Sequence, residues 1–243
     1  HVEGTMEQAA AEAARLAVRC HVPEDLTFTE AALPRLALRL KAGVAGRAQS
    51  PVPVIVLGTG SSAGAGVSAP DHAYPARLLR ELERVFPGRR FEVRTLARRG
   101  ARVADMLARL DADVVPRKPA LLVWQIGVTD AVEGVPVNRF GSDLQRGLAR
   151  LQKADIDVML MDMQFSPFTG LLINAREYRG YTRWIAKRAQ VPLLRRFEMM
   201  EFWDEQGVFD LGVSHSATAD GVHACIAHQA AGLIRAAVLA AEQ

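Results

Sequence analysis

The sequence predicts an α/β protein: a three-layer α/β/α sandwich with a five-stranded parallel sheet, preceded by two N-terminal lead-in helices. Its 243 residues suit one large α/β domain, and 49% apolar residues are enough for a sizeable core. Short apolar runs alternate with amphipathic stretches, a pattern that calls for right-handed crossovers and a sheet covered on both faces. We therefore expect a helical lead-in over residues 1–45 and one domain over residues 46–243.

The elements follow in order along the chain. Strong helix formers predict a first helix over 5–18, and a capping residue and a glycine bound a second over 29–43. Apolar runs predict strands over 52–57, 91–96, 120–126, 157–163 and 191–197. Helical periodicity predicts helices over 74–86, 102–110, 139–153, 176–189, 198–206 and 223–241. In such a sheet, functional residues gather at the carboxyl ends of the strands.

Charge and hydropathy exclude several classes of protein. The net charge of +3 is a small excess of 30 basic over 27 acidic residues, which does not indicate a nucleic-acid partner. We expect the arginine clusters, Arg195-Arg196 among them, to be solvated. No stretch approaches the roughly 20 apolar residues of a membrane span.

The chain begins at His1, so the compartment stays open: a removed signal peptide would make the protein periplasmic or secreted. The oligomeric state is open too.

The two cysteines, Cys20 and Cys225, lie near opposite ends of the chain. In an exported protein they could form one disulfide between the N-terminal segment and the last helix, whereas in a cytosol they would be buried thiols. We favour the thiol interpretation. Neither cysteine has a C-x-x-C partner and the histidine spacing matches no ligand pattern, so no metal or other cofactor is expected.

The stretch "VIVLGTGSSAGAG" (54–66) reads as a buried strand that enters a glycine-rich turn. Gly58, Gly60 and Ala63 satisfy a dinucleotide fingerprint formally, but prolines delay the next helix and no acidic residue ends the second strand. A P-loop lacks its Gly-Lys-Ser/Thr. The third interpretation is a turn that presents a nucleophile, with Ser61 and Ser62 as candidates.

A base for such a nucleophile is available near the C-terminus. "ADGVH" contains Asp220 and His223 in a D-x-x-H spacing, just ahead of the last predicted helix. At that spacing the carboxylate can fix the tautomer of the imidazole while the other ring nitrogen faces a serine. The alternative is a surface histidine with an acidic neighbour.

Together these blocks resemble the SGNH, or GDSL-type, hydrolase superfamily of esterases, lipases and carbohydrate deacetylases. The resemblance covers roughly residues 50–240. It rests on the glycine turn, "YPARLLRELERVFPG" after it, "WQIGVTDA" in place of G-x-N-D, and "ADGVH". It implies a flavodoxin-like fold, a small ester or acylated carbohydrate as substrate, and chemistry that needs no cofactor.

The resemblance also implies roles for single residues. The family's catalytic Asp and His fall on Asp220 and His223, and its oxyanion glycine falls on Gly100. Its nucleophilic Ser falls on Gly60, which cannot attack, and its oxyanion Asn falls on Thr129. Substrate contacts are expected from Gly60, Ser62, Asp130, Gln164 and Phe165.

Two functions follow. The first is a serine hydrolase that cleaves a carboxylic ester or O-acetyl group. In it, Ser61 is the nucleophile, His223 is the base and Asp220 orients His223. The amides of Ser61 and Gly100, together with Thr129, hold the oxyanion. The second is an inactive member of this fold that binds a ligand or partner. The geometry of Ser61 against His223 separates them: a contact favours the enzyme, and a Ser61 that points into the core favours the binding protein.

Overall fold

A single five-stranded sheet forms the centre of the molecule. The computed structural model describes residues 2–42, 50–171 and 175–243. The strands are β1 (Val52–Gly58), β2 (Phe91–Ala97), β3 (Leu121–Gln125), β4 (Asp157–Met161) and β5 (Leu193–Leu194). All pair in parallel in the order β2-β1-β3-β4-β5, as predicted. The order reverses between β1 and β3, so the carboxyl ends of these two strands form the switch point where ligands bind in open α/β sheets.

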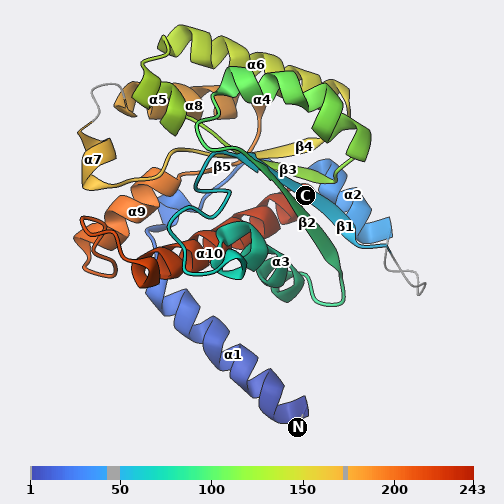
Figure 1. Cartoon of the computed structure of the whole chain (residues 1–243). Coiled ribbons are helices and arrows are strands. Elements are labelled where there is room, and N and C mark those ends of the chain that lie inside the picture. The colour runs from blue at the N-terminus through green and yellow to red at the C-terminus, as the bar shows by residue number, and fades with distance from the viewer. Residues whose placement is uncertain (1, 43–49, 172–174) are drawn as a thin grey trace.

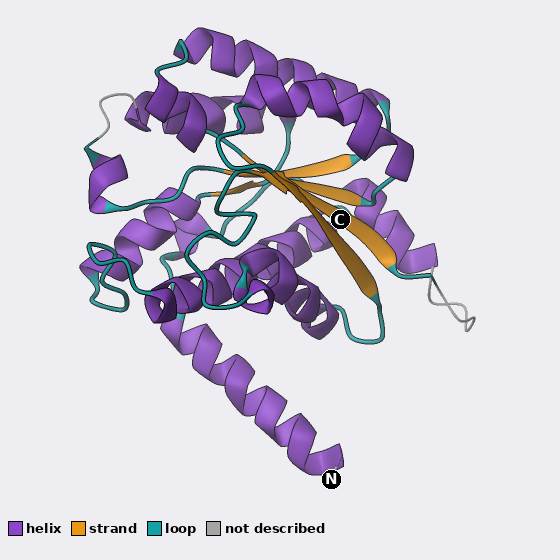
Figure 2. Ribbon diagram, viewed as in Figure 1, coloured by secondary structure: helices purple, strands orange, loops and turns teal. Residues whose placement is uncertain are grey.

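Helices cover both faces of the sheet, so the three-layer prediction is confirmed (Figures 1 and 2). One face carries α4 (Val103–Arg109), α5 (Val128–Glu133), α6 (Val137–Lys153) and α8 (Ala175–Ala189). The other carries α2 (Pro34–Ala42), α3 (Tyr74–Val85), α9 (Arg196–Glu205) and α10 (Ser216–Ala240). Two separate apolar clusters fill the space between these layers and the sheet. Packing is close: a Cβ on Gly147 of α6 would lie 2.4 Å from the Trp124 ring.

Short elements complete the chain. They comprise α7 (Pro167–Gly170), a π turn over Leu110–Val114, and 3-10 turns at Glu24–Leu26, Pro70–His72 and Val115–Arg117. The second lead-in helix is shorter than predicted, because Asp157 accepts the Arg35 and Leu36 amides at 2.8 and 2.9 Å and so caps a helix that begins at Pro34. Part of the predicted span, residue 43, lies outside the described residues.

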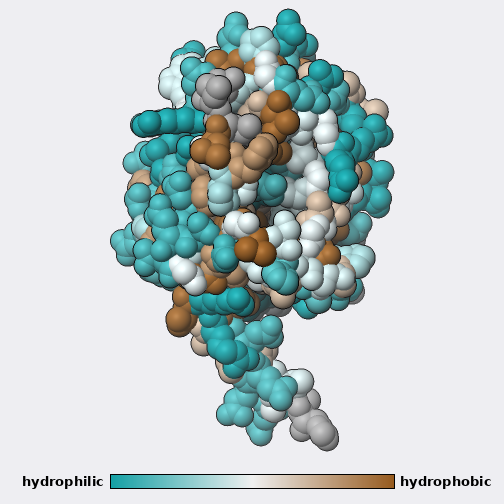
Figure 3. Space-filling view, turned by 60° about the vertical axis from the view of Figure 1, so that its left-hand side comes forward, coloured by the Kyte–Doolittle hydropathy of each residue, from teal (hydrophilic) through white to brown (hydrophobic). Residues whose placement is uncertain are grey.

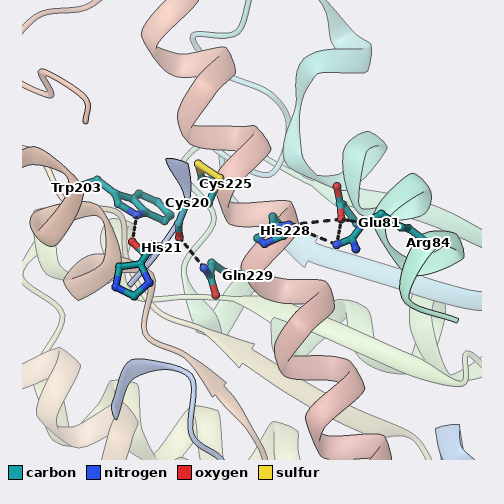
Figure 4. The surroundings of a disulfide bond; sticks show 8 residues. All are labelled: Cys20, His21, Glu81, Arg84, Trp203, Cys225, His228 and Gln229. Atoms are coloured by element: carbon teal, nitrogen blue, oxygen red, sulfur yellow. Dashed lines mark hydrogen bonds and ion pairs between the residues drawn. A yellow bond between two sulfur atoms is a disulfide. The ribbon is translucent and has the colours of Figure 1, made fainter. Parts of the chain in front are cut away.

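The first helix, α1 (Val2–Arg19), projects from the body of the protein (Figure 1). Directly after it, Cys20 and Cys225 form a disulfide, so our thiol interpretation was wrong. Figure 4 shows this link between the N-terminal segment and α10. Two hydrogen bonds hold the same segment: Gln229 Nε2 donates to the Cys20 carbonyl at 2.6 Å, and Trp203 Nε1 donates to the His21 carbonyl at 3.0 Å.

The last helix begins earlier than predicted, at Ser216 instead of residue 223. In length and hydropathy α10 reaches the range of a membrane span, contrary to our expectation for the sequence, although 67% of its most apolar window is buried inside the protein. Because it starts early, α10 contains both Asp220 and His223, which we had placed ahead of a helix. Its alanine-rich sequence packs against α3 and the sheet as a core helix.

Candidate active site at the carboxyl ends of β1 and β3

The glycine turn after β1 folds back on itself as a helix-like turn. The Ala63 amide donates to the Thr59 carbonyl at 3.1 Å, and the Ala65 amide donates to the Gly60 carbonyl at 2.9 Å. Gly64 and Gly66 have φ values of 90° and 88°, a region that favours glycine. Gly64 and Gly66 are therefore explained by backbone geometry without a nucleotide.

Gln125, the last residue of β3, holds this turn. Its Oε1 accepts from the Thr59 amide at 2.8 Å, from Ser62 Oγ at 2.8 Å and from Ser61 Oγ at 3.3 Å. A Cβ at Gly58 would lie 2.6 Å from this oxygen, so only glycine fits there. Gln125 is fully buried, and its Nε2 has no hydrogen-bond partner among the described residues. Our sequence reasoning missed it, although one amide at the end of a central apolar strand is a usable signal.

Ser61 faces a buried guanidinium. Arg196, at the start of α9, donates from Nη1 to Ser61 Oγ at 2.9 Å and from Nε to the Asp162 carbonyl at 3.1 Å. Only 2% of Arg196 is exposed, so the expectation of a solvated arginine was wrong. The error has a physical cause: β5 is only two residues long, and α9 begins at Arg196, where a longer strand was predicted.

Burial perturbs the ionisable groups around Ser61. It lowers the pKa of Arg196 and raises the pKa of Asp162 to about 7, even though Asp162 accepts the Phe197 amide at 3.0 Å. Ser62 shares a short hydrogen bond with the buried Tyr74 hydroxyl, whose pKa burial also raises. Ser61 and Ser62 are thus parts of a buried polar cluster.

The hydrogen bonding of His223 does not suit a base for Ser61. Its Nδ1 accepts the Tyr74 backbone amide at 2.9 Å, so the neutral ring carries its proton on Nε2. Burial, reinforced by Arg196, lowers the His223 pKa to about 4, which keeps the ring neutral at pH 7. Within the described part of the chain, His223 has no hydrogen bond to Ser61 or Ser62. The geometry therefore does not bring the predicted nucleophile and base together.

Asp220 lies with a different serine. It accepts the Ser68 amide at 2.9 Å and the Ser68 hydroxyl, and His72 Nδ1 lies 3.3 Å from its Oδ2. The Ser68 hydrogen bonds are the main reason that the pKa of Asp220 is lowered. Asp220 makes no hydrogen bond to His223 among the described residues. In the described part of the chain the predicted orienting contact is not formed: Ser68 binds the carboxylate, and the Tyr74 amide binds His223 Nδ1.

The other predicted site residues lie around this edge. Gly100 is exposed in the turn after β2 with a φ of 74°, and Thr129 is half-buried on α5. Asp130 is buried and accepts the Val103 amide at 3.3 Å, so it caps α4, and burial raises its pKa to about 6. No hydrogen bond among the described residues assigns the Gly100 amide or the Thr129 hydroxyl to an oxyanion.

The loop after β4 carries the two remaining candidates, Gln164 and Phe165. Both are half-buried, and the Phe165 ring packs edge-on against Phe197 at 5.2 Å between centroids. Farther along, Phe168 and Leu171 are 68% and 81% exposed. The space-filling view that turns the α7 side forward shows hydrophobic surface gathered there (Figure 3).

Gly60 occupies an open position in the turn. A Cβ built on it would meet Ala65 Cβ and Arg99 Cγ at 3.8 Å, which is ordinary van der Waals contact, and its φ is not in the left-handed region. A serine would fit here without strain. Glycine at this position is consequently not required by packing.

Comparison with known proteins identifies the family. The sequence profile of the non-GDSL lipase-like family matches residues 19–240. The chain belongs to this family. A search of curated proteins finds no match. In this chain, the glycine-rich stretch and α10 meet at the carboxyl edge of the sheet through the hydrogen bond of Ser68 to Asp220.

Solved structures of similar fold include TesA (24% identity, TM-score 0.57), which covers 75% of this chain and 94% of its own. The acetyl xylan esterase AlAXEase is 18% identical with a TM-score of 0.61, covering 74% and 98%. Axe2, an acetylxylan esterase from Geobacillus stearothermophilus, is 16% identical with a TM-score of 0.61, covering 76% and 94%. At these identities the likeness shows the fold.

Proposed function

We propose that this chain is a non-catalytic member of its hydrolase family, which binds a small acylated ligand at the carboxyl edge of the sheet. The observation that carries the proposal is the environment of Ser61. Its hydroxyl is bound by Arg196 and Gln125, while the acceptor nitrogen of His223 is occupied by the Tyr74 amide. A serine nucleophile needs a base within hydrogen-bond reach, and none of the described residues supplies one to Ser61.

The loss of the family nucleophile supports the same conclusion. Gly60 stands where the resemblance places the attacking serine, and Asp220 is bound to Ser68. Losing one oxyanion donor costs about 2.7–4 kcal/mol of barrier, which slows an enzyme, whereas losing the nucleophile removes the acyl-enzyme route. We propose the ligand class, an ester or acylated carbohydrate, by analogy with the acetyl xylan esterases of similar fold.

The Cys20–Cys225 disulfide extends the proposal to the compartment. Disulfides persist in oxidising surroundings, so we place the binding function outside a reducing cytosol.

Serine labelling tests the proposal against the hydrolase that uses Ser61. Purified protein would be treated with a fluorophosphonate probe, and p-nitrophenyl acetate turnover would be measured for the wild type, Ser61→Ala and Ser214→Ala. Ser214 is exposed and serves as the matched control. We expect no labelled serine and equal background turnover in all three proteins.

Labelling of the wild type that disappears in Ser61→Ala and persists in Ser214→Ala would overturn the proposal and establish the hydrolase. Peptide mapping of a labelled protein would also reveal attack at Ser68, the exposed serine beside Asp220. That result would overturn the proposal as well.

A further inference from the structure

Two arginines follow β2 directly beside the turn that contains Gly60. The Arg98 amide donates to the Gly58 carbonyl at 3.1 Å, which extends the pairing of β1 and β2 by one residue. The next side chain, Arg99, lies over Gly60: a Cβ there would be 3.8 Å from Arg99 Cγ and 4.0 Å from its Nε. A guanidinium therefore borders the open position at the switch point of the sheet.

The Arg98 and Arg99 guanidinium groups have no partner among the residues that the structure describes. Both side chains are exposed, and over the described ranges neither makes a hydrogen bond or an ion pair. The contrast with Arg102, in the same segment, is clear: its Nε lies 3.3 Å from Asp105 and 3.6 Å from Glu133. The charge of Arg102 is therefore balanced by carboxylates of the protein, whereas Arg98 and Arg99 can bind an anion from outside the protein.

A second positive group lies beneath the same turn. Arg196 is buried, and its Nη2 has no hydrogen-bond partner within the described part of the chain, although Nη1 binds Ser61. The backbone amides of Gly60, Ser61 and Ser62 likewise donate to no described group. An unpartnered buried donor is costly unless something outside the chain accepts from it.

The nearby carboxylates do not neutralise these donors. Asp220 is bound to Ser68, and Asp130 accepts the Val103 amide inside the protein. Asp162 is buried, and its pKa of about 7 leaves it partly protonated at neutral pH. The Arg99 guanidinium beside Gly60 is thus not paired with any of these three carboxylates.

We infer that this site takes a small oxyanion, the carboxylate or phosphate group of its ligand, between Arg99 and the turn at Gly60. A guanidinium presents a planar fork of donors that matches both groups. Because Gly60 has no side chain, a ligand oxygen can occupy the space over its Cα. The inference rests on the proposed binding function and specifies its ligand: an acylated molecule that also carries an acidic group.

Binding would be measured by calorimetry on the full chain at constant ionic strength. The probes are acetate, hexanoate and inorganic phosphate, with neutral methyl hexanoate and chloride for comparison. Arg99→Gln removes the charge at similar length, and Arg94→Gln is the matched control, since Arg94 is an exposed arginine of the same strand. We expect an anion to bind the wild type and Arg94→Gln equally, and Arg99→Gln about tenfold or more weakly.

Preference for hexanoate or for phosphate would identify which of the two groups the ligand carries. Equal anion affinity in Arg99→Gln and the wild type, tighter binding of methyl hexanoate than of hexanoate, or no anion binding would overturn the inference. The proposed function is tested separately by serine labelling. A labelled protein that still loses anion binding in Arg99→Gln would refute the non-catalytic function alone.

Discussion

Ser61 and Ser68 belong to the same glycine-rich stretch but lie in opposite surroundings. Ser61 is 8% exposed and is held by Arg196 and Gln125, with no carboxylate on its hydroxyl. Ser68 is exposed and is bound to Asp220, with His72 Nδ1 2.8 Å from its hydroxyl. Serine, histidine and carboxylate side chains are therefore all present in this region, but Asp220 and His72 lie with Ser68, while Ser61 lies with Arg196 and Gln125. His223 joins neither, since its acceptor nitrogen binds a backbone amide.

The buried cluster depends most on Gln125. In Gln125→Leu, the Thr59 amide and the Ser61 and Ser62 hydroxyls lose one acceptor, and each buried donor left unpaired costs about 1–3 kcal/mol. We expect the free energy of unfolding to fall by about 3 kcal/mol or more in urea denaturation. The control Gln152→Leu, at an exposed position of α6, should change it by less than about 0.5 kcal/mol. Equal midpoints for the two variants would show that Gln125 does not organise the turn.

The next largest predicted effect is the pH dependence of the free energy of unfolding that His223 causes. Its pKa of about 4 in the folded protein is below the ordinary value of 6.5, so the unfolded chain binds the proton first as the pH falls. Stability is thus present above pH 6.5 and is lost on acidification, by about 2 kcal/mol between pH 7 and pH 5. His223→Gln should lack this loss, while the opposing contributions of Asp130 and Asp162 stay in both proteins. Parallel stability profiles would mean that His223 titrates normally.

Single serine substitutions compare the two clusters directly. Ser61→Ala leaves Arg196 Nη1 without an acceptor, so we expect a loss of about 1–3 kcal/mol in the free energy of unfolding. Ser68→Ala, at an exposed site, should stay within about 0.5 kcal/mol of the wild type. Thermal and urea denaturation of both variants measures the difference. The reverse order of stabilities would contradict the assignment of Ser61 to the buried cluster.

The smallest predicted effect is a change in the pKa of Asp220. Ser68 is the main cause of the lowered pKa of Asp220, so Ser68→Ala should raise that pKa toward the ordinary value for aspartate. Carboxyl-detected NMR titration of Asp220 measures it, with Ser214→Ala as control. An unchanged pKa would mean that another neighbour, such as His72, governs the carboxylate.

The sequence predicted the sheet well because its signals are local. Apolar runs of strand length are separated by amphipathic helices, and parallel crossovers then leave few arrangements. The start of α10 was missed because "SHSATADG" lacks a strong apolar period, and with it the helical setting of Asp220 and His223 was missed.

Gln125 and Arg196 show what sequence reasoning could not reach. Locally, Gln125 is marked only as a single amide at the end of an apolar run, and no local signal marks Arg196 as buried. Only the neighbouring positions of β1, β3 and the start of α9 bring them to the same turn, through contacts that join residues far apart in the chain. The partner of Asp220 could not be predicted for the same reason, since Ser68 lies 152 residues away.

The disulfide closes almost the whole polypeptide into a covalent ring, because its two half-cystines are 205 residues apart. A protease that cuts any loop between Cys20 and Cys225 opens the ring but releases no fragment. Such a nicked protein would run as one piece on a denaturing gel and separate into two only after reduction. The β-sheet and the candidate site would therefore stay covalently joined to the α10 segment after a single cleavage in any one of these loops.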